Sequence, residues 1–520
     1  MSSPVVGIDL GTRYALASVW IDGEARLIPN RYGEFRTPSI ICLDQKGWHV
    51  GEEARRRAFH PVFGCWSDVK RRLGTDWAPV ADGRHRSAQE ILVPLISTIR
   101  EDCEAYLHSM VTDCVITVPA QFSFLERSAM ARAARAGGFE DVRILNEPTA
   151  AAFACESTGR ILVFDFGGGT VDVSVVERDG QTWQVLESLG DSSAGGVEID
   201  RALALSMAEK LGITLDQDDP LFRLLLFEAE QVKCALSFQG KLTWQVPIPL
   251  ASSRSELSFS RSDVEILAAP WLKKAVNLGV TLWKRHSPDC VIMVGGSSRI
   301  PLLKTLLARE IPVPVRMGRS PDEAVAIGAA MYGVNGTDRL LLDVLSESLG
   351  IIAFDGTPVS ILKKGHPLPA RSNRAFKSVG GGDLSLSLFQ GDPERSSRCR
   401  IVAKMDLQDM DIGERVDLDF RIDSGGLLKV HLSRESGESI SIAPMELGVS
   451  SGDSLDGEDP EALKKRLKRI KPSLSIFQVE RAEKLLGKVD MLADLEPHLY
   501  RDGLKVAARM IEAIEDEVGR

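Results

Sequence analysis

The chain lacks several patterns that mark large classes of protein. No apolar run approaches the roughly 18 residues that a membrane-spanning helix needs, and the first residues have no basic flank before an apolar core. The eight cysteines are scattered and none forms a C-x-x-C pair, so the sequence suggests neither a zinc site nor a disulfide framework. We therefore expect a protein with no membrane partner that stays in the cytoplasm, with cysteines that are mostly buried and reduced.

Two further signals are missing. No G-x-x-x-x-G-K-[ST] stretch occurs and no G-x-G-x-x-G opens a helix, which excludes a P-loop enzyme. Acidic residues outnumber basic ones by 73 to 63, a formal charge of −10, and we expect no nucleic-acid partner because phosphate neutralisation takes clustered lysine and arginine. The composition is that of a folded globular protein, and 520 residues correspond to about three domains.

The first two-thirds of the chain alternate strand-like and helix-like patterns. This order is typical of an α/β architecture, in which ligands bind beyond the strand ends. The predicted strands cover residues 5–10, 114–118, 161–166 and 290–294, and the predicted helices cover 124–136, 222–236 and 262–284.

The pattern changes near residue 336. Short strand patterns separated by glycine and proline then predict an all-β module, with strands at 351–354, 385–389, 416–422, 427–432 and 439–442. Helical spacing returns beyond residue 452 and predicts a small helical bundle. We therefore divide the chain into an α/β domain at 1–336, a linker at 337–345, a β module at 346–450 and a helical segment at 451–520.

Residues 8–12 and 164–170 repeat one plan, in which an apolar strand is followed by aspartate, an apolar residue, glycine and threonine. A duplicated nucleotide-binding fold with one phosphate loop in each half would produce this repeat. A third glycine loop at 295–297 also follows an apolar strand, and glycine lets backbone N–H groups approach phosphate closely. A tight hairpin turn is the alternative for any one loop, but three together favour a triphosphate cleft.

Aspartates accompany these loops at Asp9, Asp165 and Asp172. Carboxylates beside phosphate are repulsive unless a cation lies between them. The sequence therefore predicts Mg²⁺ at these three residues.

Six segments resemble one family, the DnaK-type heat shock protein 70 chaperones. They are residues 6–12, 115–120, 146–152, 165–172, 293–301 and 322–330. Residues 340–344 and 348–350 resemble that family's interdomain linker and the start of its peptide-binding domain, and the chain is most similar to the short HscC-type branch. The resemblance implies a duplicated actin/hexokinase-like ATPase domain, a β-sandwich substrate-binding domain and a short C-terminal helical bundle.

The resemblance also implies roles for the matching residues. Lys70 matches the lysine that positions the attacking water, and the other residues implied for catalysis are Asp9, Glu147, Asp165, Thr170 and Asp172, around hydrated Mg²⁺ and K⁺. Residues implied for binding ATP or ADP are Gly11, Thr12, Arg13, Tyr14, Gly167, Gly168, Gly169, Gly195, Gly196, Glu230, Lys233, Ser237, Gly295, Gly296, Ser297, Arg299 and Asp322. Pro119, Arg127, Glu147 and Asp343 would couple the domains. Ile351, Phe354, Val379, Leu384 and Phe389 would line the peptide groove, whereas Leu386 is assigned to the core.

The function that the resemblance implies is a chaperone that binds exposed apolar segments of unfolded client proteins in a cycle gated by ATP hydrolysis. Its partners would include a J-domain cochaperone and a nucleotide-exchange factor. A nucleotide-bound regulatory scaffold is the alternative, because Arg13 stands where the family usually carries a second phosphate-contacting threonine and the helical end is short. A sugar or small-molecule kinase of the same superfamily is a weaker alternative, since a kinase needs no appended β module.

Overall fold

The computed structural model of the chain describes residues 4–58, 62–155, 157–214, 220–246, 255–318, 320–334, 340–353, 357–378, 382–394, 399–434 and 439–442. The chain divides into two units. The first consists of Met1–Ser346, Gly365–Arg371 and Phe420–Val430, and the second of Glu347–Lys364, Ser372–Asp419 and His431–Arg520. The predicted helical segment at 451–520 lies outside the described residues. Within the described part of the chain, no helix is both long and apolar enough to cross a membrane.

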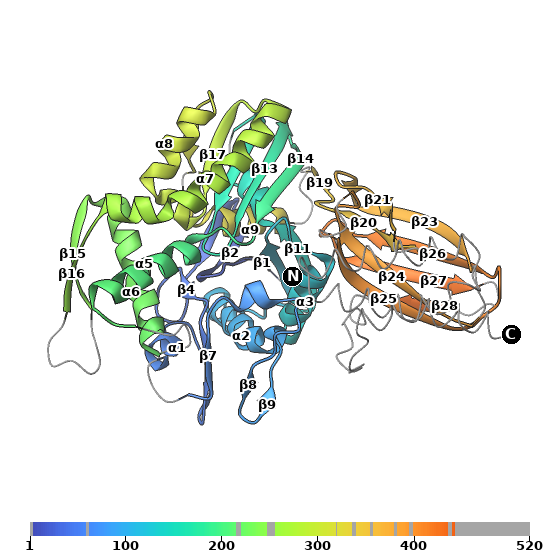
Figure 1. Ribbon diagram of the computed structural model, residues 1–520, viewed down its shortest axis with the longest axis horizontal. Helices are drawn as coiled ribbons and strands as arrows, with labels where there is room; N and C mark the ends of the chain where they lie inside the picture. The colour runs from blue at the N-terminus through green and yellow to red at the C-terminus, as the bar shows by residue number, and fades with distance from the viewer. Residues whose placement is uncertain are drawn as a thin grey trace, which may run out of the picture. The chain divides into compact units, whose positions relative to one another are not determined.

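The first unit contains two sheets with the same strand order (Figure 1). The first sheet runs β11-β10-β1-β2-β3, and the second runs β18-β17-β12-β13-β14 before it continues into β19 and β22. In each sheet the leading strand, β1 or β12, is antiparallel to the next strand and parallel to a later one, β10 or β17. The repeat seen in the sequence therefore corresponds to a repeat of topology.

The strands of the first sheet are β1 (Val5–Leu10), β2 (Tyr14–Ile21), β3 (Glu24–Ile28), β10 (Asp113–Val118) and β11 (Asp141–Asn146), with β4 (Thr37–Pro38) paired to β2. Those of the second are β12 (Gly159–Phe166), β13 (Val171–Asp179), β14 (Thr182–Asp191), β17 (Cys290–Val294), β18 (Val315–Met317), β19 (Leu340–Val344) and β22 (Pro367–Leu368). The helices are α1 (Gly51–Arg57), α2 (Ala88–Leu107), α3 (Phe124–Ala136), α4 (Glu147–Phe153), α5 (Gly196–Lys210), α6 (Pro220–Phe238), α7 (Arg261–His286), α8 (Pro301–Glu310) and α9 (Ala324–Gly333), with short 3₁₀ helices η1 (Val69–Arg72) and η2 (Gly296–Arg299).

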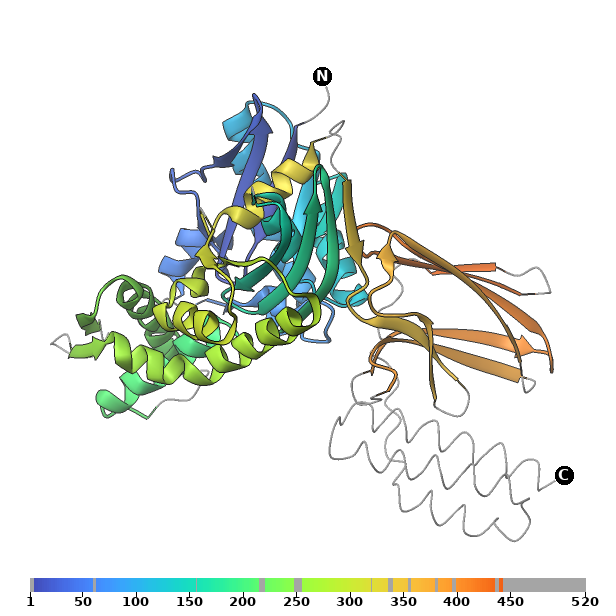
Figure 2. The same ribbon diagram turned by 90° about the horizontal axis from the view of Figure 1, so that it is seen from above.

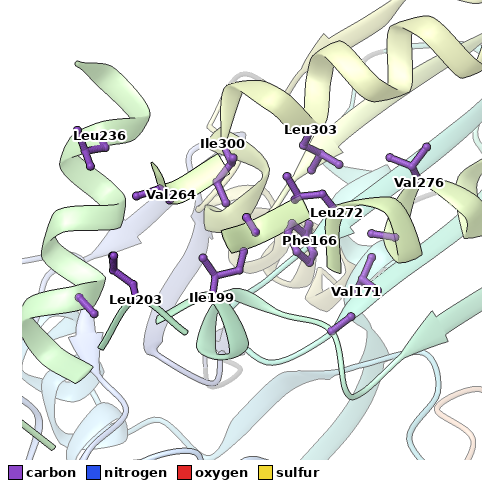
Figure 3. Close-up of a cluster of buried hydrophobic side chains, with 14 of the residues drawn as sticks. Phe166, Val171, Ile199, Leu203, Leu236, Val264, Leu272, Val276, Ile300 and Leu303 are labelled. Carbon is purple, nitrogen blue, oxygen red and sulfur yellow. The ribbon is translucent and has the colours of Figure 1, made fainter. Parts of the chain in front are cut away.

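Buried apolar side chains hold each half together. In the second half, Phe166 from β12, Ile199 from α5 and Leu272 from α7 point toward one another in a large buried cluster (Figure 3). α4 and α9 pack closely, because a Cβ on Gly328 would collide with the backbone of Ala150. The core therefore fixes the strand ends from which the candidate site is built.

Residues 340–344 of the predicted linker form a strand, β19. β19 pairs in parallel with β14 and antiparallel with β22, and Figure 2 shows it alongside the strands of the second half. Asp343 on β19 is buried. Apolar residues at 340–342 are typical of such a strand as well as of a docking linker.

The β module forms two sheets, with strand orders β21-β20-β24-β25 and β23-β26-β27-β28. Their strands are β20 (Ser348–Ile352), β21 (Pro358–Leu362), β23 (Ala370–Lys377), β24 (Gly382–Gly391), β25 (Cys399–Met410), β26 (Arg415–Ile422), β27 (Leu428–Arg434) and β28 (Ser439–Ile442). Four of the five strands predicted here correspond closely to β24, β26, β27 and β28, and the fifth overlaps β20.

Two cysteines overturn one sequence expectation. The structure joins Cys42 and Cys65 by a disulfide, so the expectation of no disulfide was wrong. The two residues lie directly opposite each other in a small sheet of β5 (Ile41–Asp44), β6 (Gly47–Val50) and β7 (Gly64–Trp66). Their separation of 23 residues forms no recognisable motif, because only the strand register brings them together.

Two further strand pairs complete the described elements of the first unit. They are β8 (Val80–Ala81) with β9 (Arg84–His85), and β15 (Lys241–Val246) with β16 (Ser255–Ser260). None of these strands contributes a residue to the candidate site described below.

Candidate active site

Two hairpin turns bring the predicted phosphate loops into contact. One turn joins β1 to β2 and the other joins β12 to β13. A Cβ on Gly169 would collide with the side chain of Thr12, and a Cβ on Gly168 would lie 3.0 Å from Cγ of Arg13. Both loops are therefore tight hairpin turns, and they also converge from the two halves as a phosphate site requires.

The second loop lies on the N-terminus of α5. Gly196 donates its N–H to the carbonyl of Gly167 at 3.1 Å, and Val197 donates to that of Gly168 at 2.7 Å. Backbone packing leaves no space for a side chain at Gly195, where a Cβ would lie 2.6 Å from the carbonyl carbon of Gly169. Glycine at these positions thus allows the loop and the positive end of a helix dipole to meet.

Four carboxylates and one ammonium group gather at the same strand ends. Asp165 and Asp172 face each other across the β12–β13 pair. Asp9, near the end of β1, accepts a hydrogen bond from Thr117 Oγ1 at 3.3 Å. Glu147 begins α4 and forms a buried ion pair with Lys70 of η1.

Burial and mutual repulsion make these carboxylates hard to ionise. Burial, with the charge of Glu147 adding to it, raises the pKa of Asp9 to about 7 and that of Asp172 to about 7. The same two causes raise the pKa of Asp165 well above its usual range. A cation placed among these groups would restore their ionised forms.

The residues present fit a hydrated magnesium ion. Asp172 Oδ1 is buried and has no hydrogen-bond partner among the described residues. In that part of the chain, no three histidine, cysteine or acidic side chains are close enough to coordinate an ion directly. Magnesium characteristically keeps several of its waters, so water-mediated contacts with Asp9, Asp165 and Asp172 suit this arrangement.

The predicted adenosine contacts lie on α6 and around η2. Glu230 and Lys233 are buried on α6, and Ser237 donates to the backbone carbonyl of Lys233 at 3.0 Å. A Cβ on Gly196 would lie 2.9 Å from Lys233 Nζ and would collide with Ser297, so α5, α6 and η2 converge at this point.

The other side of this region is closed by ion pairs on Asp322. Arg299 donates to Asp322 through Nε at 3.0 Å and Nη2 at 2.6 Å. A Cβ on Gly296 would lie 3.2 Å from the same carboxylate, and Gly295 occupies the left-handed region with φ +82°. Arg36, which the sequence did not single out, also donates to Asp322 at 2.6 Å.

Tyr14, Thr170 and the remaining loop residues lie at the same two hairpins. Tyr14 starts β2, and burial raises its pKa to about 12. The backbone carbonyl of Thr170 accepts the N–H of Gly167 at 3.0 Å and closes the second turn. The structure thus brings the predicted catalytic and nucleotide residues into one region of the first unit.

The coupling residues form a connected set of hydrogen bonds. The buried guanidinium of Arg127 donates to Asn146 Oδ1 at 2.7 Å and to the carbonyl of Ala120 at 3.1 Å. Asn146 in turn donates to Asp343 at 2.9 Å, and Thr149 donates to the same carboxylate at 3.2 Å. Asn146 was missed by the sequence reasoning, although it directly precedes Glu147.

Two other contacts complete this set. Pro119 accepts the N–H of Phe122 at 3.0 Å and so shapes the turn after β10. Arg127 also donates to the carbonyl of Gly425 at 3.0 Å, in the Phe420–Val430 segment of the same unit.

The predicted groove residues are placed only in part. Ile351 and Phe389 are buried, with exposed fractions of 4% and 0%, so their side chains pack inside the β module and present no surface to a peptide here. Leu386, assigned to the core, is only half-buried. Phe354, Val379 and the side chain of Leu384 lie outside the described residues.

A comparison with protein families agrees with this arrangement. The model of the Hsp70 protein family matches residues 5–85 and 77–467. Members of that family are ATPases with a chaperone role, which bind client polypeptides and bind nucleotide, typically with Mg²⁺. Since the match extends over most of the sequence and includes both hairpin loops, the chain belongs to the Hsp70 family.

Proposed function

We propose that this chain hydrolyses ATP where its two hairpin loops meet and uses that reaction to gate the binding of exposed apolar segments of unfolded proteins. The observation that carries the proposal is Lys70. This lysine is buried and paired with Glu147 beside the converging loops and the cluster of three aspartates. A buried lysine held by one carboxylate, next to backbone donors suited to phosphate, is typical of a phosphoryl-transfer site.

Each group has a distinct task in this mechanism. The loop N–H groups and Thr12 would bind the phosphate chain, and Lys70 would orient the attacking water toward the terminal phosphorus. Glu147 holds the Lys70 ammonium in position. Magnesium, when bound, supplies charge neutralisation on the phosphate oxygens.

The hydrogen bonds from Arg127 through Asn146 to Asp343 support coupling between hydrolysis and the linker strand. Asn146 directly precedes Glu147, so a shift of that carboxylate would also move Asn146 and change its hydrogen bond to Asp343 on β19. Coupling of this kind is a free-energy difference between two states of the linker. The short HscC-type assignment, K⁺, a J-domain cochaperone, a nucleotide-exchange factor and a cytoplasmic location belong to the same proposal and rest on the resemblance alone.

Steady-state ATPase measured with and without an apolar heptapeptide tests the proposal. We expect the peptide to raise turnover of the full chain, and Lys70→Ala to lower turnover by about 10²–10³-fold, the usual effect of removing one positioned charge from such a site. Tight ATP binding with slow turnover that the peptide does not change would contradict the proposal. That result would favour the regulatory scaffold, which needs bound nucleotide but no cycle.

A further inference from the structure

Arg13 connects the two halves of the nucleotide region by its side chain. It follows Thr12 in the first hairpin turn, and its stem lies over Gly168 of the second loop, where a Cβ would come within 3.0 Å of Arg13 Cγ. Its Nη2 donates to Asp200 Oδ2 on α5 at 3.1 Å. The guanidinium therefore reaches from the first hairpin, over the second, to a helix of the other half.

Asp200 is an uncommon anchor for such a contact. Its side chain is completely buried, and its other carboxylate oxygen lies 2.6 Å from Lys233 Nζ on α6. One carboxylate thus holds the first hairpin through Arg13 and the predicted adenosine helix through Lys233. A buried carboxylate is stable only while its charge is paired, so Asp200 needs both cations.

A second carboxylate lies on the opposite side of Arg13. Nη1 is 3.9 Å from Asp68 Oδ1, at the residue that precedes η1 and its Lys70. Burial would lower the pKa of Arg13, but the nearby charges of Asp68, Glu230 and Asp200 outweigh it and raise that pKa. Arg13 is therefore a fixed positive charge with contacts to three elements of the site.

We propose that Arg13 is a positioning residue that holds the nucleotide cleft closed and slows the release of bound nucleotide. For the two halves to separate, the hairpin must leave α5, and the pair between Arg13 and Asp200 must then break inside a buried region. The proposal rests on the nucleotide site of the proposed function. It adds a role in release that a threonine at this position would not have, because a threonine side chain is too short to reach Asp200.

A nearby pair offers a graded comparison. Arg71 of η1 donates to Glu198 of α5 at 2.8 Å and to the carbonyl of Ser192 at 2.8 Å. It joins η1 to the same helix, α5, but its side chain is 26% exposed, against 12% for Arg13. Exposed ion pairs contribute less than buried ones, so Arg71 should slow release less than Arg13 does.

The test is a release experiment on the full chain. The protein is loaded with methylanthraniloyl-ADP and Mg²⁺, and fluorescence decay is followed after mixing with excess unlabelled ADP. We expect Arg13→Thr to speed release about tenfold or more, because truncating one partner of a buried hydrogen-bonded charge pair acts mainly on dissociation. The release rate of Arg13→Lys should lie between those of the wild type and Arg13→Thr, since lysine keeps the charge without the planar fork of donors. Arg71→Thr should have a smaller effect, and Arg26→Thr, an ion-paired arginine on β3 outside the cleft, should match the wild type.

A double-mutant cycle shows whether Arg13 acts through Asp200. In an Asp200→Asn background we expect Arg13→Thr to change the release rate by less than about twofold, because the contact is already lost. Release by Arg13→Thr at the wild-type rate would overturn the proposal, and so would the same acceleration in both backgrounds, which indicates direct contact with nucleotide instead. Far-UV circular dichroism checks folding, and Arg13→Lys carries the test where Arg13→Thr does not fold. A wild-type chain that gives no fluorescence change on loading would overturn the nucleotide site itself, and a normal loading signal separates the two failures.

Discussion

The β1–β2 and β12–β13 hairpins have the same topology but differ in the residues that form their turns. In the first, Asp9 lies opposite Leu16 and the turn carries Thr12 and Arg13. In the second, Asp165 lies opposite Asp172 and the turn consists of three glycines before Thr170. The first hairpin thus supplies side chains, whereas the second supplies backbone groups and a pair of carboxylates.

This difference follows from how closely the hairpins approach. Thr12 and Arg13 occupy the space in which side chains on Gly169 and Gly168 would lie. If both turns carried side chains beyond hydrogen, they would collide. If both consisted of glycines, the Arg13 guanidinium that reaches from one half to the other would be missing. The duplicated fold therefore became asymmetric at the point where its copies meet.

The largest expected effect concerns the pair of carboxylates that only the second hairpin carries, and it is a dependence of stability on pH. The pKa of Asp172 is raised to about 7 and that of Asp165 is raised well above its usual range, so the folded chain without Mg²⁺ keeps protons that the unfolded chain has lost. The resulting stability is fully present below about pH 4 and is lost as pH rises through about 7. We expect the free energy of unfolding of the metal-free, nucleotide-free chain to fall by several kcal/mol between these pH values.

Urea unfolding across this pH range, with and without Mg²⁺, measures the effect. Asp172→Asn should flatten the pH dependence because it removes one of the repelling charges, whereas the exposed Asp22→Asn should leave it as in the wild type. Stability that rises with pH in the metal-free chain would show that the carboxylates of the second hairpin are already compensated.

The next effect is steric and concerns the glycines that only the second hairpin has in its turn. An added methyl group at Gly169 collides with Thr12, so Gly169→Ala should lower the free energy of unfolding by about 1–3 kcal/mol and weaken nucleotide binding. Gly168→Ala meets mainly the flexible stem of Arg13 and should be milder, and its cost should shrink in an Arg13→Ala background, which removes the Cγ atom that the new methyl group approaches. Gly240→Ala, where the methyl group enters open space, is the matched control. Equal losses at Gly168 and Gly169 would contradict this explanation.

Elements defined by local pattern were predictable from the sequence. Apolar strands ending in glycine located β1 and β17 with their bounds, and a helical pattern that ends at two glycines located α3. β25, by contrast, was not predicted, although apolar and charged side chains alternate over residues 403–407, because no turn residues mark its ends. The sequence showed that the two hairpins differ at Arg13, but it did not show that Arg13 contacts Asp200 in the other half.

Two of the missed residues, Asp200 and Arg36, share one property, which is that their partners are distant in sequence. Arg13 and Asp200 are separated by 187 residues, and Arg36 and Asp322 by 286. Nothing local distinguishes Asp200 from an ordinary charged residue on a helix. Its role emerges only when packing buries it between Arg13 and Lys233, and a single sequence does not record that packing.

The smallest effect concerns the neighbours of the two leading aspartates. The buried Thr117 donates a hydrogen bond to Asp9, whereas the buried Val294 lies opposite Asp165 in the second sheet. Thr117→Val makes the first half resemble the second at nearly constant volume, and we expect it to cost about 1 kcal/mol at pH 8, where Asp9 is ionised and relies on that donor. At pH 5 Asp9 is protonated, because its pKa is about 7, and the cost should shrink. Unfolding measured at both pH values checks this expectation, and an equal loss at each would mean that Thr117 contributes by packing rather than by its hydrogen bond to the carboxylate.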